Sequence, residues 1–137
     1  MAITVLTDAY VSINGVVLSD HVDSVEINQE VDDVDVTAMG ATARAHMPGL
    51  RADSFTLTCL QDFAAAKIDA TLNGLVGSAA GFPFEIRPTS GAVSATNPKY
   101  TGTALLLKYQ PLAGKVGERS ETQVEFVCQG AITRATA

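Results

Sequence analysis

Between Val22 and Val36 the chain alternates polar and apolar residues, and this stretch constrains the fold more than any other. In its first part the apolar residues share one parity: Val25, Ile27 and Val31. The polar residues between them share the other: Ser24, Glu26, Asn28 and Glu30. A period of two is typical of a strand with one buried and one solvated face. The parity reverses at Asp32, which predicts a bulge or a tight bend between two strands.

Acidic residues dominate the first third of the chain. The first lysine or arginine is Arg44, and eight of the 15 carboxylates precede it. From Arg44 onward nine basic residues face the remaining seven acids, so the two parts carry −8 and +2. An ordinary solvated sheet face is one interpretation, although such faces normally mix charges of both signs. A carboxylate-coated face repels polyanions, which argues against a nucleic-acid reader, as does the net charge of −6.

Most of the remaining sequence also predicts short strands. Asn14-Gly15 between two apolar runs indicates a hairpin with a type I′ turn. Further strands are expected over residues 54–60, 82–87, 100–109 and 121–129. Asp62 is a good N-cap, so the one expected helix covers about residues 62–74. We therefore expect a single mainly β domain over residues 1–137, an antiparallel β-sandwich or partial barrel with one flanking helix.

The segment from Thr37 to Asp53 has no clear period and is dense in alanine and glycine. Loops longer than about 12–15 residues without secondary structure tend to be functional or disordered. This one carries apolar and basic side chains that suit docking: Met39, Arg44, His46, Met47, Leu50 and Arg51. We expect an inter-subunit loop here, with plain disorder as the alternative.

Signatures of catalysis and of metal or cofactor binding are missing from the sequence. His21 and His46 each stand alone, and the two cysteines are too far apart for a CxxC metal site. Cys59 and Cys128 occupy apolar positions of expected strands, which favours buried thiols over a disulfide. The acidic run at residues 32–35 lacks the glycine turn and distal glutamate of a calcium loop. With no nucleophile–base pair, we expect a protein without catalysis, cofactor or metal.

Short strings along nearly the whole chain resemble, in their order, the tail tube (major tail) proteins of long-tailed bacteriophages. The strings are Ser19–Val25, Asp35–Gly40, Gly49–Leu57, Gln61–Ala64 followed by Leu72, Phe84–Pro88, Thr96–Gly102 and Gly130–Arg134. The variants most similar to this chain belong to phages that infect actinobacteria. The resemblance implies six-fold rings that stack into a tube, in which one sheet of each subunit joins a continuous inner barrel.

The same resemblance implies the partners and the location. The chain would bind copies of itself, a tape-measure protein, and the tail terminator and tail-tip proteins, and DNA would pass through without specific binding. It would reside in the tail of the virion after assembly in the host cytoplasm, without membrane contact. The long loop would reach an adjacent subunit or ring. Asp33 and Asp35 would either line the bore or meet Arg44 or Arg51 of the next ring.

A lining of carboxylates suits a DNA conduit, because it leaves no deep electrostatic well that would stall the polyanion. By strand parity the expected lumen-lining residues are Glu26, Glu30, Glu121 and Glu125. Two other functions stay open. A monomeric β-sandwich, such as a virion decoration or carbohydrate-binding module, would need exposed aromatics, yet the chain has no tryptophan and 6% aromatics. The tube of a contractile injection system is the other alternative.

Overall fold

The computed structural model describes residues 3 and 5–137, and it is mainly β. One sheet holds eight strands, seven of them in the order β2-β1-β7-β8-β9-β6-β3, with β10 paired to β8. A separate two-stranded sheet consists of β4 and β5. The elements in chain order are β1 (Tyr10–Ile13), β2 (Val16–Val17), the 3-10 helix η1 (Ser19–His21), β3 (Val22–Asn28), β4 (Val31–Asp35), β5 (His46–Arg51), β6 (Ser54–Leu60), α1 (Ile68–Leu72), β7 (Phe82–Arg87), β8 (Lys99–Lys108), β9 (Glu121–Cys128) and β10 (Thr133–Ala135).

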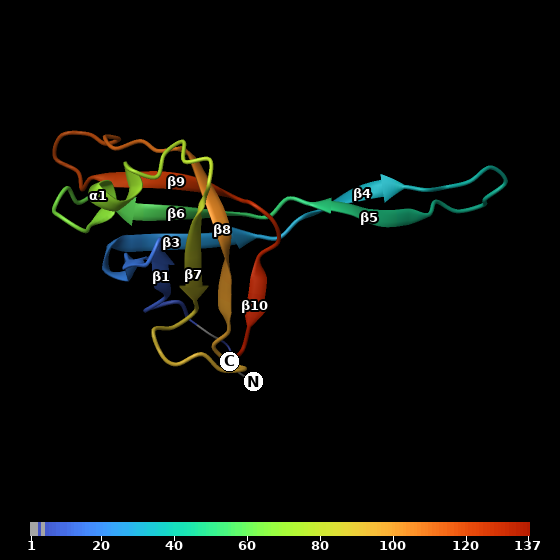
Figure 1. Cartoon of the computed structure of the whole chain (residues 1–137), viewed down its shortest axis with the longest axis horizontal. Helices are drawn as coiled ribbons and strands as arrows, with labels where there is room; N and C mark the ends of the chain where they lie inside the picture. The colour runs from blue at the N-terminus through green and yellow to red at the C-terminus, as the bar shows by residue number, and fades with distance from the viewer. Residues whose placement is uncertain (1–2, 4) are drawn as a thin grey trace.

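The large sheet folds over on itself, and β8 is the strand at which it turns. The first half of β8 pairs with β7, from Tyr100 opposite Ile86 to Ala104 opposite Phe82. Its second half pairs with β9. Figure 1 shows β3, β6 and β9 side by side, with β1, β7 and β10 crossing their direction steeply. The expected mainly β, antiparallel fold is confirmed, and the barrel is not closed.

A cluster of phenylalanines holds the two halves of the folded sheet together. Phe55 on β6 stacks on Phe126 of the neighbouring β9, with ring centroids 4.5 Å apart. The same ring meets Phe84 on β7 at 4.4 Å, and Phe82 meets Phe126 edge-on at 5.9 Å. All four side chains are buried. Burial of each contributes on the order of 2 kcal/mol, so this cluster fixes how β7 packs over β6 and β9.

The first hairpin follows its turn residues. Asn14 and Gly15 adopt φ values of 51° and 81°, the left-handed conformations that a type I′ turn requires. The strands expected over residues 54–60 and 82–87 are found with those bounds, and β8 and β9 end within a residue of the expected ends. The short strand β10, which closes the chain against the start of β8, was not predicted.

The helix is much shorter than the predicted 62–74: α1 covers only Ile68–Leu72. Asp62 does not cap it: its carboxylate accepts a hydrogen bond from the amide of Ala64 at 2.9 Å and closes a tight turn. Ala66 then has a φ of 60°, which interrupts any continuous helix. The side chain of an aspartate competes for nearby amides in this way, and here the turn prevails over the helix.

The segment from Thr37 to Asp53 is not an irregular loop throughout, and that prediction was wrong for residues 46–51. His46–Arg51 forms β5 and pairs with β4. Together they make a hairpin that extends away from the body, continuing the direction of β3 and β6 (Figure 1). We call residues 31–51 the arm. The irregularity expected at Asp32 is present, because the register shifts between Val31 and Asp33.

Neither cysteine forms a disulfide. Cys59 is fully buried, as predicted, and burial raises the pKa of its thiol to about 12. Cys128 is half-buried, and burial together with the nearby charge of Asp53 raises its pKa to about 11. Both thiols are therefore protonated near neutral pH and unreactive.

Candidate functional site

The four-stranded section formed by β3, β6, β9 and the second half of β8 has one apolar and one polar face. Residues on β6 alternate between buried and half-buried, and those in the middle of β9 alternate between buried and exposed. We call the solvated side the polar face. Its polar members on the three strands are Ser24, Glu26, Asn28, Ser54, Thr56, Thr58, Glu121, Gln123 and Glu125, and the apolar Leu60 and Val127 lie on the same side. This face carries no aromatic residue among those members, so it offers acidic and hydroxyl groups rather than a stacking platform.

Three of the four glutamates predicted for a lumen share this face. Glu26 lies opposite Thr56, which lies opposite Glu125, so the two glutamates belong to one row across the sheet. Glu121 lies at the start of β9, where Arg119 forms an ion pair with it and approaches Asp23 to 3.5 Å. Glu30 lies beyond the end of β3, at the base of the arm.

Lys108 completes the row that holds Glu26 and Glu125. It is paired with Glu125 through a bulge, because the register shifts between Leu106 and Lys108. Leu107 is the extra residue and is 65% exposed. No ion pair involves Lys108 among residues 3 and 5–137. The polar face thus ends on β8 with an unpaired cation, which the sequence analysis overlooked.

One surface of the arm is charged. Its ion pairs cross between the strands: Asp33 to Nδ1 of His46 at 2.8 Å, and Asp35 to Arg44 at 2.9 Å. Hydrogen bonds from Thr37 and the ion pair with Arg44 hold the pKa of Asp35 below its ordinary value. Arg44 therefore has a partner within its own chain, one strand away.

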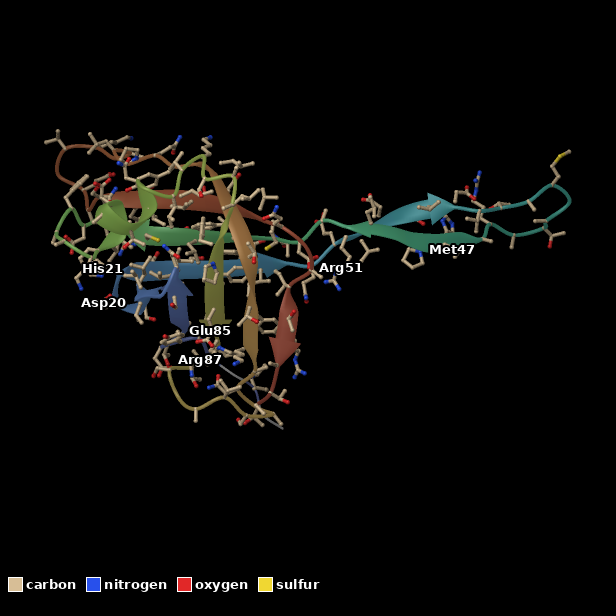
Figure 2. The ribbon with its side chains drawn as sticks, viewed as in Figure 1. Asp20, His21, Met47, Arg51, Glu85 and Arg87 are labelled. Carbon is tan, nitrogen blue, oxygen red and sulfur yellow. The ribbon has the colours of Figure 1, made fainter. Side chains whose placement is uncertain are left out.

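The opposite surface of the arm is apolar and has no packing partner in the described chain. Val34 lies opposite Met47. Two residues further along, the amide of Val36 donates a hydrogen bond to the carbonyl oxygen of Ala45. Val34 and Val36 are each 44% exposed and Met47 is 57% exposed. Figure 2 shows Met47 on the arm, away from the body. Met39 at the tip and Leu50 near the base are more exposed still. An isolated two-stranded hairpin is marginally stable in water, and these apolar side chains are not buried by any described part of the chain.

A bulge lies near the base of the arm. Between the pairs Val31–Arg51 and Asp33–Pro48, the single residue Asp32 faces Gly49 and Leu50 together. A β-carbon on Gly49 would lie 2.9 Å from Cγ2 of Val34 and 3.2 Å from Cβ of Asp32. Any other residue at this position would therefore require Val34 or Asp32 to shift.

Asp53 anchors the arm to the body, a role that the sequence analysis missed. Its carboxylate accepts hydrogen bonds from the amides of Ile132 at 2.8 Å and Glu30 at 3.3 Å, and pairs with Arg51 at 2.9 Å. Its side chain is fully buried. Burial alone would raise the pKa of Asp53, but these hydrogen bonds and the Arg51 charge outweigh it and lower the pKa. No local pattern in the sequence signals this role, because the donors come from three separate segments.

A second charged cluster lies where β3 begins, far from the arm along that strand (Figure 2). Nε2 of His21 is 2.8 Å from Asp62, and Nδ1 is 2.9 Å from Asp20. Asp20 also approaches Lys67 to 3.3 Å. The carboxylate of Asp20, followed by that of Asp62, raises the pKa of His21 against the opposing effect of burial. This cluster fastens η1 to the segment that leads into α1.

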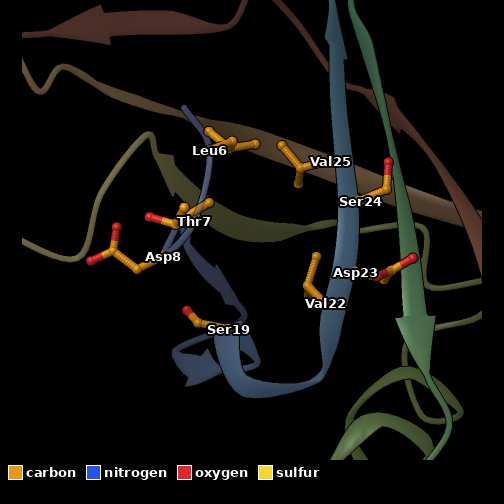
Figure 3. Close-up of a pocket in the computed structure, with 9 residues that line it drawn as sticks. Leu6, Thr7, Asp8, Ser19, Val22, Asp23, Ser24 and Val25 are labelled. Carbon is orange, nitrogen blue, oxygen red and sulfur yellow. The ribbon is translucent and has the colours of Figure 1, made fainter. Parts of the chain in front are cut away.

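The concavities of the described surface are small or open. A pocket of about 90 Å³ lies between residues 6–9 and the start of β3, lined by Asp8, Ser19 and Asp23 among others (Figure 3). An open hollow of about 310 Å³ lies inside the loop at residues 112–120. Among residues 3 and 5–137, no cluster of histidine, cysteine and carboxylate side chains is arranged to hold a metal. No helix in that part of the chain is long and apolar enough to cross a membrane.

Comparison of the sequence with protein-family models and with curated proteins finds no match. Solved structures, in contrast, share the fold over most of the chain. A chain in the virion of native gene transfer agent (GTA) particle is 15% identical, with a TM-score of 0.74 over 93% of this chain and 95% of that one. A chain of the tail of empty GTA particle, with C6 symmetry, is 16% identical, with a TM-score of 0.68 over 85% and 83%.

A third likeness is to an extracellular contractile injection system. A chain of the PVC sheath-tube complex in extended state is 12% identical, with a TM-score of 0.72 over 99% of this chain and 93% of that one. At these identities the likeness concerns the fold. The protein has the fold of chains found in GTA virions and tails and in an injection-system sheath-tube complex.

Proposed function

We propose that this chain is the structural subunit of a tail tube, located in the tail of a virion or virion-like particle. The observation that carries the proposal is the likeness of fold, over nearly the whole length of both chains, to components of a GTA virion and of a sheath-tube complex. Its role is architectural and non-catalytic. The similarity to tubes of phages that infect actinobacteria remains part of the proposal and rests on the sequence strings.

We infer a ring of six subunits. The section of β3, β6, β9 and the second half of β8 offers four strands per subunit. Six copies give a barrel of about 24 strands, which at ~4.8 Å spacing and ~40° tilt has a backbone diameter of about 48 Å. Side chains reduce the bore to roughly 35–40 Å, enough for a hydrated duplex, whereas three subunits would close on the DNA. The C6 symmetry of the GTA tail supports this number.

In this assembly the polar face lines the bore. Glu26, Glu121 and Glu125 would present carboxylates to the passing DNA, with Glu30 at the rim. Fixed negative charge repels the phosphate backbone. Because the wall does not neutralise phosphates, it displaces none of the counterions condensed on the DNA, and it therefore holds the DNA weakly. The opposite face of the same strands is buried in the core, which leaves the polar face as the one available to the lumen.

The arm would join rings to one another. It leaves the body in the direction of β3 and β6 (Figure 1), so stacking subunits head to tail brings it against the next ring. Its apolar surface of Val34, Val36 and Met47 supplies the contact. The tape-measure protein, the tail terminator and the tail-tip proteins are the further partners that this role implies.

Negative-stain microscopy of concentrated, purified protein tests the proposal. We expect stacked rings with a stain-filled bore, and six-fold end-on views. Dispersed particles of monomer size at every concentration would instead favour a monomeric decoration or carbohydrate-binding module. The likeness to the sheath-tube complex keeps an injection-system tube as the second candidate. Antibody labelling of particles from producing cells separates the two, because a tailed virion carries a DNA-filled head and an injection system does not.

A further inference from the structure

A second apolar surface lies at the end of the strands opposite the arm. Residues 109–120 connect the end of β8 to the start of β9, and we call them the end loop. The arm lies between the end of β3 and the start of β6. Because β6 and β9 are antiparallel, with Ser54 opposite Val127 and Leu60 opposite Glu121, the arm and the end loop leave opposite ends of the ladder. Figure 1 shows them on opposite sides of the body along the direction of β6.

The end loop is held at its base and exposes apolar side chains beyond it. The backbone amide of Gln61 donates a hydrogen bond to the carbonyl oxygen of Ser120 at 2.9 Å, and its side chain donates one to the carbonyl oxygen of Pro111 at 2.7 Å. Between these two anchors, Leu112 is 80% exposed and Val116 is fully exposed. Both line the open hollow of about 310 Å³. A loop with a fixed base loses little freedom on binding, so it suits a docking surface.

The arm of a second copy is the occupant that this placement favours. Within the described chain, the two most exposed large apolar side chains are Val116 in the end loop and Met39 at the tip of the arm. The two surfaces cannot meet within one subunit, because they lie at opposite ends of the strands (Figure 1). Head-to-tail contact between two copies covers both at once. A contact between two different surfaces of one chain can repeat without closing, which is what a stack of rings requires.

The length of the arm suits this contact. Residues 31–40, at ~3.3 Å per residue, give the arm a reach of roughly 30 Å. With the strands tilted by ~40° in the proposed ring, the arm advances along the tube axis by roughly 20–25 Å. It therefore passes the edge of its own ring. In a head-to-tail stack the next ring presents the opposite ends of its strands there, and the end loops lie at those ends.

We propose that the apolar surface of the arm, formed by Val34, Val36 and Met47, packs against the end loop of a subunit in the next ring. Leu112 and Val116 supply the receiving side chains. The inference rests on the proposed tube function, and it names the surface that receives the arm. The contact joins rings to one another and takes no part in closing a ring.

Removing the apolar side chains of the end loop tests the contact. Leu112→Ser with Val116→Ser leaves the core untouched, so the subunit should fold normally, which circular dichroism checks. We expect the critical concentration for tube formation, measured by sedimentation, to rise about tenfold or more, with separate rings visible by microscopy. Val17→Ser, an exposed apolar site on β2, is the control and should assemble like wild type. Tubes of the double variant that form at the wild-type concentration overturn the proposal.

Cross-linking identifies the subunit that receives the arm. Met47→Cys with Val116→Cys in one chain is assembled into tubes and treated with a flexible bismaleimide, with the wild-type chain as the background for Cys59 and Cys128. Because each subunit would be linked to the rings on both sides, we expect a ladder on denaturing gels that continues beyond six subunits. Met47→Cys with Ser90→Cys, which places the second thiol on the loop between β7 and β8, should give no ladder.

The other outcomes separate this contact from the tube function. A ladder that stops at six subunits places the arm within its own ring, and tubes without any cross-link leave the arm to a different partner. Either result overturns the contact while the tube function stands. Failure of the wild-type chain to form tubes under any condition overturns the tube function and this contact with it.

Discussion

The amide of Ile132 donates a 2.8 Å hydrogen bond to Oδ2 of Asp53, and 79 residues of chain separate the two. The same carboxylate accepts a hydrogen bond from the amide of Glu30 and forms an ion pair with Arg51, both at the base of the arm. A single buried group thus joins the arm, the start of β6 and the C-terminal segment.

The first prediction concerns this carboxylate. Asp53→Ala leaves two amides without their acceptor in a buried site, so we expect the free energy of unfolding to fall by about 2–4 kcal/mol. Urea denaturation followed by circular dichroism measures it. Asp32→Ala on the exposed arm is the matched control and should change stability by less than about 0.5 kcal/mol. Equal small effects from both would show that Asp53 contributes little.

The contribution of Asp53 to the free energy of unfolding should also depend on pH. Because its folded-state pKa is lowered, its contribution is present above the unfolded value of about 3.9 and is lost as the pH falls through the folded value. We expect the stability difference between wild type and Asp53→Ala to shrink below about pH 4. A difference that stays constant down to pH 2 would contradict the assigned charge.

His21 should give the opposite dependence. Its folded-state pKa is raised by Asp20 and Asp62, so its contribution is complete below the unfolded value of about 6.5. The contribution is lost as the pH rises through the folded value. We expect wild type to exceed His21→Gln in melting temperature at pH 5.5 and the gap to narrow by pH 8.5. A gap that widens with pH would contradict the cluster geometry.

The arm should matter for assembly and little for folding. Replacing Val34, Val36 and Met47 by serine removes its apolar surface without touching the core. We expect a folded monomer with a near-wild-type melting temperature that forms no tubes by microscopy. Val17→Ser, a similarly exposed apolar site on β2, is the control and should assemble. Normal tubes from the triple variant would refute the docking role.

The orientation of the polar face has its own test. Thr56→Lys with Gln123→Lys adds two positive charges per subunit, or about 12 in a ring of six, in the middle of that face. We expect tubes to form, with DNA ejection from mutant virions slowed at low salt and partly restored as salt rises. Ser90→Lys with Thr96→Lys adds the same charge on the loop between β7 and β8 and should eject normally. Wild-type ejection at every salt concentration would place the polar face away from the DNA.

Local patterns in the sequence predicted most of the body and failed where distant residues decide. The strand over residues 82–87 was predictable because prolines and alternation bound it, and the first hairpin because Asn14-Gly15 determines its turn. The helix was overpredicted, since a single side-chain bond from Asp62 favours a turn over a helix start. No local propensity distinguishes these outcomes in an alanine-rich segment.

In the arm, local patterns failed in the opposite way, because they missed a strand that is present. Pro48 and Gly49 in sequence argue against a strand, yet Gly49 lies in the bulge opposite Asp32, and Pro48 lies opposite Asp33 in a sheet of only two strands, each of which has an unpaired edge. The alternation of the sequence correctly placed Glu26, Glu121 and Glu125 on one face. It could not place Lys108 there, because the extra residue Leu107 shifts Lys108 from the buried to the polar side of the sheet. Asp53 looked like the end of a loop, and only the folded chain brings the Ile132 amide to it.

The continuity of the arm with β3 and β6 also determines how the subunit carries mechanical load. If a neighbouring subunit in the proposed tube pulls on the arm along its axis, both strands of the arm are drawn the same way, and the force passes to the ladder between β6 and β9. That ladder runs from Ser54 opposite Val127 to Leu60 opposite Glu121, parallel to the pull. Its hydrogen bonds are loaded together in shear rather than opened one after another. In the proposed tube, each subunit would therefore keep its fold while the tube bends or stretches.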